Sequence, residues 1–481
     1  MGKLLSKSKY MSGLESHALL WTCVNDPGKI PEPDMVLQDR FDDGHEVGDL
    51  AKKLFSEGVD LSDYEFLDNV RKTKELCGER KTLFECVFLH DRCHARVDIL
   101  VPNGEGFDLI EVKSSTKAKA VHIDDLAFQK YLAEKNGLII KNVYVLHLNN
   151  EYVREESLDL NSLFKKTDVT PEVFSINYVE LKIAEFLRVI DLPECPCFEV
   201  EDYPKSEYGN FFIDEFLEGL PEGNVFELYN VRKKKAVEMY MQGIHSLKDI
   251  QTNYKTNHKQ QIQILAQDEV QVDERQIKSF IKGLTRPIIH LDFESFSLAI
   301  PEYKKTKPYQ HLPFQYSMHI EHESGEVEHK EFLFEEYGDP REAFIQNLIK
   351  DLPSKGTILV FHKAYEIPRL KEIARDFPEY QEDIHKIILR IQDLKDPFFN
   401  FWYHNKKQRG SNSIKNVLPI FSDKTHKGLV VSNGSEAMIL YKKNRGKLTD
   451  ELRKDLLDYC ELDTEAMLII LRGLKDLIGE E

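Results

Sequence analysis

The feature that most restricts the fold of this chain is one succession of elements that occurs twice, at 82–148 and again from residue 286. The first stretch contains four strand-like runs, which are TLFECVFL, HARVDILV, FDLIEVKSS and NVYVLHL. A segment with helical periodicity, IDDLAFQKYLAEKNG, precedes the last of them. The second stretch repeats the order of three strands, a helix and a strand, beginning at PIIHLDFESF. Strands that alternate with helices in this way form sheets covered by helices. The sequence therefore predicts an α/β protein with two separate sheets.

The chain between these two stretches has a different texture. The segment 191–209, DLPECPCFEVEDYPKSEYG, is rich in proline and turn residues and indicates a boundary. Residues 210–285 are mostly polar with helical periodicity. A length of 481 residues is enough for two or three domains. We expect an α/β domain at 1–190, a linker and helical segment at 191–285, and a second α/β domain at 286–481.

Charge and composition exclude some classes of protein. The net charge of -18 argues against a protein that coats nucleic acid through its overall field. It does not exclude a nuclease, because carboxylates that hold metal ions add negative charge and substrate contacts can be local. No apolar run approaches the roughly 20 residues of a membrane span, and the N-terminus does not read as a signal peptide. Seven cysteines spread over the chain do not indicate a disulfide framework, so we expect a cytoplasmic protein.

Two acidic residues and a lysine lie close together in the first predicted sheet. Asp98 follows one strand, the turn PNGEG predicts a hairpin, and Glu111 and Lys113 lie two residues apart on the next strand. Because side chains of a strand alternate between its faces, Glu111 and Lys113 point the same way. The hairpin brings Asp98 close to Glu111.

This arrangement suits metal-assisted cleavage of a phosphodiester bond. Asp98 and Glu111 would hold a hard cation such as Mg²⁺ or Mn²⁺ through oxygen, and the cation would polarise the phosphate and activate a water molecule. Lys113 would position that water or stabilise charge on the phosphate oxygens. From the spacing alone, a surface hairpin with a Glu–Lys pair is an equally good interpretation.

A second group of acidic residues lies in the C-terminal stretch. The segment HLDFESF puts Asp292 and Glu294 on one face of a predicted strand. Glu366 follows a later strand, and the C-terminal helix carries Tyr459 and Asp463, four residues apart on one face. Asp292 and Glu294 alone have two interpretations, a metal site or a strand that ends in polar residues.

The residues around Asp98 resemble the RecB-like branch of the PD-(D/E)XK nuclease superfamily. The match consists of Asp98, then Glu-Val-Lys at 111–113, then a helix that carries Gln129. The resemblance implies a restriction-endonuclease-like fold in which Asp98 and Glu111 bind metal, and Lys113 and Gln129 are catalytic.

Three further residues are weighed for the same site. Such families often carry a tyrosine four residues after the glutamine, whereas Tyr131 lies only two residues after Gln129. Positions two apart on a helix face different directions, so we expect Gln129 to reach the site and Tyr131 not to. Glu85, in the preceding strand, is a candidate additional acidic residue. Some relatives place a metal-binding histidine in an early helix, and His45 lies near that position but out of register.

Many relatives of this branch also hold an iron–sulfur cluster through one early and three late cysteines. Here the early position corresponds to Ser16, and late in the domain only Cys195 and Cys197 lie close together. A cluster needs a full set of thiolates. We therefore expect no iron–sulfur cluster.

The order of the C-terminal residues resembles DnaQ-like 3′–5′ exonucleases of the DEDD class, in their tyrosine-bearing form. The resemblance implies a ribonuclease H-like fold and two divalent ions, Mg²⁺ or Mn²⁺. By position, the metal ligands would be Asp292, Glu294, Glu366 and Asp463. Tyr459 would orient the attacking water, since an ordinary pKa near 10 makes tyrosine a poor base.

The second motif departs from this family. It is usually Asn-x-x-x-Asp and here runs from His362 to Glu366, whose longer side chain can still bind metal. Asp393 is a further candidate, although a turn or helix cap is at least as good an interpretation. In GSNSIKNVLP, the residues that could approach substrate phosphates are Ser411, Ser413 and Lys415, although a structural loop is the favoured interpretation.

Taken together, five segments resemble a bacterial family of uncharacterised proteins that joins a RecB-like half to a DnaQ-like half: LSKSKYMSGL, GHEVGDLAKKLFSEG, DDLAFQKYL, FQYSMHIE and GSNSIKNVLPIF. The expected function is a metal-dependent nuclease with two active sites that acts on DNA or RNA in processing, repair or defence against phage. One alternative is a nucleic-acid-binding or assembly protein with one degenerate site. Another is a metal-dependent phosphohydrolase that acts on small nucleotides.

Overall fold

The computed structural model describes residues 3–55, 57–205, 211–251, 254–425, 428 and 430–480. It is a mixed α/β structure with several sheets, as the sequence predicts. The chain forms two compact units: Met1–Glu218 with Leu298–Gln310, and Gly219–Ser297 with His311–Glu481. This division differs from the expected segments, because the helical region after Gly219 belongs to the second unit. The stretch Leu298–Gln310 belongs to the first unit, although it connects two strands of the second.

The first unit contains one sheet and nine α-helices among the described residues. Its strands are β1 (Leu5–Ser6), β2 (Val59–Asp60), β3 (Leu83–His90), β4 (Cys93–Asn103), β5 (Gly106–Lys113), β6 (Ile140–Leu148) and β7 (Phe164–Asp168). Its helices are α1 (Lys7–Glu15), α2 (His17–Asn25), α3 (Met35–Lys52), α4 (Phe66–Gly78), α5 (Ala120–Lys135), α6 (Leu160–Leu163), α7 (Thr170–Ser175), α8 (Val179–Ile190) and α9 (Phe211–Glu218). Two short 3₁₀ turns are η1 (Pro27–Lys29) and η2 (Val200–Lys205).

The sheet of the first unit has the order β2-β3-β4-β5-β6-β7, and β1 pairs with β4. Strands β3, β4 and β5 are antiparallel, whereas β5 and β6 are parallel and are connected through α5. The predicted hairpin between β4 and β5 is confirmed, with Asn103 opposite Gly106. The turn requires small residues, because a Cβ at Gly106 would lie 2.4 Å from the Ile139 carbonyl oxygen.

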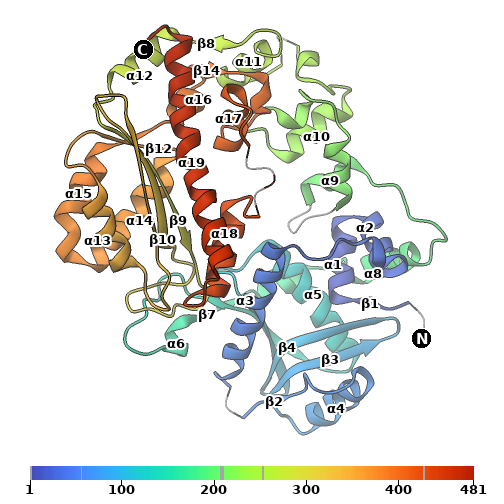
Figure 1. The fold of residues 1–481 in the computed structure, drawn as a ribbon. Coiled ribbons are helices and arrows are strands. Elements are labelled where there is room, and N and C mark those ends of the chain that lie inside the picture. Colours follow the sequence, from blue (N-terminus) through green and yellow to red (C-terminus); the bar gives the residue numbers. More distant parts are fainter. Residues whose placement is uncertain are drawn as a thin grey trace. The chain divides into compact units, whose positions relative to one another are not determined.

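Helices cover both faces of this sheet (Figure 1). On one face, α5 packs its apolar residues against β3, β4 and β6, in a core that includes Phe128, Leu132 and Val145. On the other face, Val47 and Ala51 of α3 pack with Ile110 of β5. The core on that face also contains Ala299 and Ile300 of the inserted stretch.

The second unit contains a five-stranded sheet, a two-stranded sheet and ten α-helices among the described residues. Its strands are β8 (Gln271–Val272), β9 (Ile288–Phe296), β10 (Leu312–Glu321), β11 (Val327–Leu333), β12 (Thr357–Val360), β13 (Ile391–Asp393) and β14 (Tyr403–His404). Its helices are α10 (Lys233–Met241), α11 (His258–Leu265), α12 (Glu274–Lys282), α13 (Arg341–Asp351), α14 (Lys363–Asp376), α15 (Gln381–Arg390), α16 (Asp396–Phe399), α17 (Ile414–Phe421), α18 (Gly434–Asn444) and α19 (Asp450–Leu477). The 3₁₀ turns are η3 (Val225–Glu227), η4 (Leu247–Asp249), η5 (Pro378–Tyr380) and η6 (Lys406–Gln408).

The larger sheet has the order β11-β10-β9-β12-β13. Strands β9, β10 and β11 are antiparallel, and β12 and β13 continue the sheet in parallel with β9. Helix α13 lies between β11 and β12 in the chain, so the predicted succession of three strands, a helix and a strand is confirmed.

The long helix α19 lies along one face of this sheet, and α13, α14 and α15 cover the other face (Figure 1). The helix begins where the Thr449 hydroxyl accepts a hydrogen bond from the Leu452 backbone N–H, and its first turn is acidic. Its apolar side, including Met467, Ile470 and Leu471, packs into the core, which holds the helix against β9 and β10. Among the residues that the structure describes, none of the helices is both long enough and apolar enough to span a bilayer.

Candidate active sites

The hairpin of β4 and β5 positions the acidic residues of the first candidate site. The Val112 backbone N–H donates a 2.7 Å hydrogen bond to Oδ2 of Asp98, so Asp98 lies directly beside the strand that carries Glu111 and Lys113. Glu111 is only 1% exposed. Its face of β5 is covered by α5, which carries Gln129.

Both carboxylate oxygens of Glu111 have close hydrogen-bond donors. The Lys113 and Lys7 ammonium groups lie 2.6 Å and 2.8 Å from Oε1, and the Gln129 amide donates to Oε2 at 2.6 Å. Gln129 also donates to Oδ1 of Asp125 at 2.7 Å, and Lys113 lies 3.2 Å from Oδ2 of Asp125. Two lysines and an amide thus enclose two buried carboxylates.

Sequence reasoning missed Lys7 and Asp125. Asp125 could have been found, because it precedes Gln129 by four residues on α5 and positions four apart share a helix face. Lys7 gives no local signal, because it lies 104 residues from Glu111 in the chain. Tyr131 is directed elsewhere, and its hydroxyl donates to Glu180 at 3.2 Å.

These neighbours set the charges of the site. Burial alone would raise the pKa of Glu111, but the positive charges of Lys113 and Lys7 and their hydrogen bonds outweigh it and hold that pKa well below its usual range. Burial, and then the charge of Glu111, raises the pKa of Asp98 to about 7. Glu111 is therefore ionised at neutral pH, whereas Asp98 is close to half protonated.

A cleft of about 1060 Å³ opens over this site. The acidic side chains in its lining are Asp49, Glu85, Asp98 and Glu111, and the basic ones are Lys7, Arg40, Lys52, Arg96 and Lys113. Glu85 has a left-handed backbone with φ of 55°, and the pairs on either side place it opposite Asp98 in the register of β3 and β4. His45 of α3 is exposed and lines the cleft as well. The cations along the cleft suit a phosphate backbone.

In the second unit, β9 and α19 bring three carboxylates together. Asp292 and Glu294 lie on the face of β9 that α19 covers, and α19 presents Asp463 toward them. One ligand oxygen from each of these three residues lies within 4.8 Å of the others. Among the described residues, this is one of two groups of three side chains that could hold a metal ion, and neither group includes Asp98 or Glu111.

The electrostatics of this second site are those of buried acids. Burial, and then the charge of Asp463, raises the pKa of Asp292 to about 8. Burial together with Asp292 and Asp463 raises the pKa of Glu294 well above its usual range. Like charges crowded in a buried place oppose ionisation, and a hard divalent cation would relieve that repulsion through oxygen ligands. The donor set therefore fits Mg²⁺ or Mn²⁺.

Tyr459 lies at the edge of the same group. Burial, and then the charges of Asp463, Glu294 and Asp292, raise the pKa of the Tyr459 phenol far above its usual value, so the phenol keeps its proton. Gly434 lies beside the same group, since a Cβ at this position would come into van der Waals contact with Glu294 at 3.5 Å and the Tyr459 hydroxyl at 3.9 Å.

Glu366 is 2% exposed in the first turn of α14, and its Oε2 has no hydrogen-bond partner among the described residues. Burial, and then the charge of Asp292, raises the pKa of Glu366 well above its usual range. The charge of Asp292 therefore acts on Glu366. Glu366 itself does not belong to the group of Asp292, Glu294 and Asp463, whose ligand oxygens lie within 4.8 Å of one another.

Asp393 instead acts as a cap for α14. Its carboxylate accepts backbone hydrogen bonds from His362 at 2.8 Å, Lys363 at 2.9 Å and Lys395 at 3.0 Å. These bonds hold His362 in a left-handed conformation with φ of 101°. The cap interpretation of Asp393 therefore fits its contacts, and the strained backbone before α14 fixes the position from which Glu366 projects.

The loop before α17 contributes one basic residue near the second site. The Lys415 ammonium lies 5.8 Å from the centre of the Tyr459 ring and donates to the Ser432 carbonyl at 2.6 Å. Ser413 and Ser411 make local contacts, with the Ser413 hydroxyl donating to Asn416 at 2.6 Å and the Ser411 hydroxyl accepting from the Ser413 N–H at 3.3 Å. The serines thus shape the loop.

Two of the residues considered for an iron–sulfur cluster, Ser16 and Cys195, lie at α2. Ser16 is buried directly before this helix, and the Cys195 thiol lies 3.6 Å from the Thr22 hydroxyl within it. Cys195 and Cys197 are exposed free thiols. That no cluster binds here stays a prediction.

Comparisons with known proteins identify relatives without an assigned function. The sequence profile of a domain of unknown function, DUF2779, matches residues 289–413. Uncharacterized proteins of Mycoplasma pneumoniae and Mycoplasma genitalium are each 26% identical, over 42% and 40% of this chain and 34% and 33% of their own lengths. An uncharacterized protein of Ureaplasma parvum is 28% identical over 40% of this chain and 32% of its own.

The chain thus spans about a third of the length of the curated relatives it matches. No solved structure matches it. The matched stretch 289–413 contains Asp292, Glu294 and Glu366, whereas Tyr459 and Asp463 lie outside it.

Proposed function

We propose that this protein is a metal-dependent nuclease that hydrolyses phosphodiester bonds of DNA or RNA, with a DnaQ-like 3′–5′ exonuclease site in the second unit. The observation that carries the proposal is the group of Asp292, Glu294 and Asp463, whose ligand oxygens lie within 4.8 Å of one another. The sheet order around it and the buried Glu366 support the same interpretation.

The residues of this site have separate tasks in the proposed reaction. Bound divalent ions would polarise the phosphate and lower the pKa of the attacking water. Asp292, Glu294 and Asp463 supply the negative charge and oxygen ligands that hold such ions. The Tyr459 phenol, which keeps its proton, orients water through its hydroxyl rather than acting as a base. Lys415 supplies positive charge at the edge of the site for a phosphate of the substrate.

The first unit carries a second proposed nuclease site, with a RecB-like PD-(D/E)XK arrangement. Asp98 and Glu111 are its proposed metal ligands, and Lys113 stabilises negative charge on the phosphate. Gln129 holds the carboxylates of Glu111 and Asp125 in place. The basic side chains along the cleft bind the nucleic acid backbone.

One observation favours a second candidate function for the first unit, namely nucleic-acid binding without cleavage. Lys7 and Lys113 both bond to Oε1 of Glu111, so Lys7 occupies a position in which a metal ion would bind that oxygen. A metal ion would have to displace the Lys7 ammonium or share the carboxylate with it. A site in which Lys7 replaces the ion would bind phosphate through its lysines and leave it intact.

The test is a cleavage assay with the full-length protein, Mg²⁺ or Mn²⁺, and end-labelled single- and double-stranded DNA and RNA. We expect metal-dependent shortening of at least one of these polymers, abolished by a chelator. A small nucleotide offered alone distinguishes the phosphohydrolase alternative. Absence of cleavage of every polymer, by protein shown to be folded, would contradict the nuclease proposal.

A further inference from the structure

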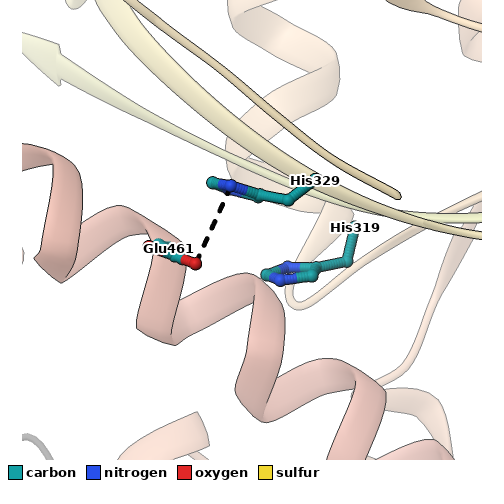
Figure 2. A group of neighbouring side chains, drawn as sticks. All are labelled: His319, His329 and Glu461. Carbon is teal, nitrogen blue, oxygen red and sulfur yellow. Dashed lines mark ion pairs between the residues drawn. The ribbon is translucent and has the colours of Figure 1, made fainter. Parts of the chain in front are cut away.

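A second group of side chains, separate from the three carboxylates, forms where α19 meets β10 and β11. His319 lies on β10, His329 on β11 and Glu461 on α19 (Figure 2). One ligand atom from each lies within 4.8 Å of the other two. The three residues come from three different elements of one unit.

The sheet register explains why the two imidazoles meet. His319 and His329 are directly opposite each other in the antiparallel pair of β10 and β11, so their side chains lie on the same face. Their rings stack with centres 4.6 Å apart. Helix α19 packs against this face and brings Glu461 to the pair, with its carboxylate 3.7 Å from Nδ1 of His329.

The hydrogen bonds around the histidines determine which ring nitrogens are free. The Thr464 hydroxyl has one proton, and the Glu461 carbonyl at 2.9 Å can only accept it. With the proton placed there, Thr464 accepts from the Ser317 hydroxyl at 2.8 Å and from Nδ1 of His319 at 2.9 Å. In this arrangement Nδ1 of His319 carries a proton, and its Nε2 presents a lone pair.

The same reasoning extends to the second ring. Because Ser317 gives its only proton to Thr464, it accepts from Nε2 of His329 at 2.9 Å. Nε2 of His329 thus carries a proton and Nδ1 is the nitrogen that faces Glu461. A single chain of hydroxyls therefore orients two imidazoles through one nitrogen each and leaves the other nitrogen of each ring as a ligand atom, which is how protein metal sites hold their histidines.

We propose that His319, His329 and Glu461 bind one divalent transition-metal ion of the zinc class. Two imidazoles and one carboxylate suit zinc and its neighbours in the first transition row, whereas Mg²⁺ prefers oxygen ligands alone. Ligand atoms around tetrahedral zinc lie about 3.4 Å apart. The Glu461 side chain is 46% exposed, so its carboxylate has room to move from its present 3.7 Å separation from His329 to a ligand position. Water completes the coordination.

Such an ion ties the β10–β11 hairpin to α19 at a point close to the candidate exonuclease site. Glu461 and Thr464 flank Asp463 on the helix, and Ser317 lies opposite Asp292 in the register of β9 and β10. The ion therefore has a positioning role for α19. Its binding does not depend on the proposed nuclease activity and is measured without it.

The competing explanation is an ion pair between protonated His329 and Glu461. At 3.7 Å, their closest atoms are beyond hydrogen-bond distance, and a charged His329 would lie against the His319 ring. An ion pair of this kind binds no zinc.

The experiment measures zinc stoichiometry with the metal-free full-length protein. Zn²⁺ is titrated against a chromophoric chelator in millimolar Mg²⁺, which competes for the carboxylate site. We compare the wild-type protein with His329→Ala and Glu461→Gln, and use His385→Ala on α15 as the matched control, because His385 is exposed and outside the group. The exposed thiols of Cys195 and Cys197 are present in every variant and cancel in the comparison.

We expect the wild-type protein and the control to bind one more tight equivalent of Zn²⁺ than His329→Ala. Glu461→Gln should weaken that equivalent at least about 100-fold, since losing only an outer hydrogen-bond partner of a ligand costs 10–100-fold. Because Glu461 is half-exposed, this variant should fold normally. Equal zinc binding by the wild-type protein and both variants, or no tight equivalent in the wild type, would overturn the proposal.

Discussion

The two candidate active sites balance the charge of their carboxylates in opposite ways. In the first unit, Glu111 lies within 2.8 Å of two lysine ammonium groups and its pKa is lowered. In the second unit, Asp292 and Glu294 crowd against Asp463 and their pKa values are raised. The first site has lysine ammonium groups beside its carboxylates, whereas in the second site the raised pKa values favour protonation or, as we propose, the binding of a metal ion.

This difference separates two functions of a metal ion. At the second site, an ion would supply catalysis and also relieve repulsion among buried acids, so its binding should stabilise the unit that carries it. At the first site, the lysines already stabilise Glu111, so an ion would add little stability. Substitutions should therefore have different consequences in the two units.

The largest effect is expected from Asp292→Ala. This change removes a proposed metal ligand and should lower exonucleolytic trimming by about 10³-fold or more, because metal ions supply several kcal/mol of transition-state stabilisation. It should not unfold the protein, since it removes one of three repelling carboxylates. End-labelled substrate on a gel measures the rate. Unchanged trimming by pure Asp292→Ala protein would refute the assignment.

Lys113→Ala should have the next largest effect and should affect only the first site. Losing a group that stabilises charge costs about 10²–10³ in rate. Lys113→Ala is measured in a protein that also carries Asp292→Ala, so that only the activity of the first site remains. Asp463→Ala should lower the second activity as Asp292→Ala does. Lys130→Ala on α5 is a matched control, because Lys130 makes its contacts outside the site: its ammonium lies 2.9 Å from Glu134 and 4.3 Å from the centre of the Phe174 ring.

If Lys113→Ala or Asp463→Ala alone silences both activities in folded protein, the two sites are not independent. Nucleic-acid binding without any first-site cleavage in the Asp292→Ala background would favour the binding function that Lys7 suggests. Either result would break the comparison between a self-neutralised site and a metal-dependent one.

The contribution to the pH dependence of stability should differ in sign between Asp292 and Glu111, whereas Asp98, with a pKa raised to about 7, has the sign of Asp292. Asp292 binds its proton more tightly when folded, with a pKa of about 8, than when unfolded, with a pKa of about 3.9. Without divalent ions, the free energy of unfolding of the second unit should therefore fall as the pH rises from about 4 to 8, by a few kcal/mol. The lowered pKa of Glu111 has the opposite effect: its contribution is present above about pH 4.3 and is lost as the pH falls below that value.

The two tryptophans allow each unit to be followed separately. Trp402 lies in the second unit and Trp21 in the first, so the Trp21→Phe and Trp402→Phe variants each retain one reporter. We expect Mg²⁺ to raise the melting temperature at pH 8 in the Trp21→Phe protein by several degrees and to change it little in the Trp402→Phe protein. Equal shifts in both would contradict the comparison.

The smallest effect is expected from substitutions of Asp393. They test whether this residue caps α14 or binds a metal ion. Asp393→Ala removes an acceptor for the His362 and Lys363 N–H groups at the start of α14 and for the Lys395 N–H after β13, and should cost about 1 kcal/mol of stability. Asp393→Asn retains one acceptor oxygen and should lose less. The trimming rate should fall only a few-fold in both variants, and thermal unfolding is measured on the same samples. A loss of trimming comparable to that of Asp292→Ala would instead indicate that Asp393 is a metal ligand.

Local patterns predicted the main strands and helices of both sheets, because alternating and helical periods report burial directly. They also predicted that Asp98 approaches Glu111, since the segment PNGEG indicates a hairpin, and the structure forms that hairpin with Asn103 opposite Gly106. Helix geometry showed that Gln129 and Tyr131 cannot both reach the site, and the family resemblance favoured Gln129, which donates to Glu111 whereas Tyr131 donates to Glu180. The short strands β1, β2 and β8 were not anticipated, because two residues carry no period.

Tertiary structure decided which distant residues contact the predicted site residues. Lys7 reaches Glu111 across 104 residues, and the stretch Leu298–Gln310 joins the first unit although its neighbours build the second. His319, His329 and Glu461 meet only because a strand register and a helix packing coincide. The sequence by itself determined periodicity, local turns and residue spacing, which act over a few residues. Packing decided that lysines lie beside Glu111 and that Asp292 and Asp463 lie close to each other. Such contacts join distant segments of the chain and therefore depend on the whole core.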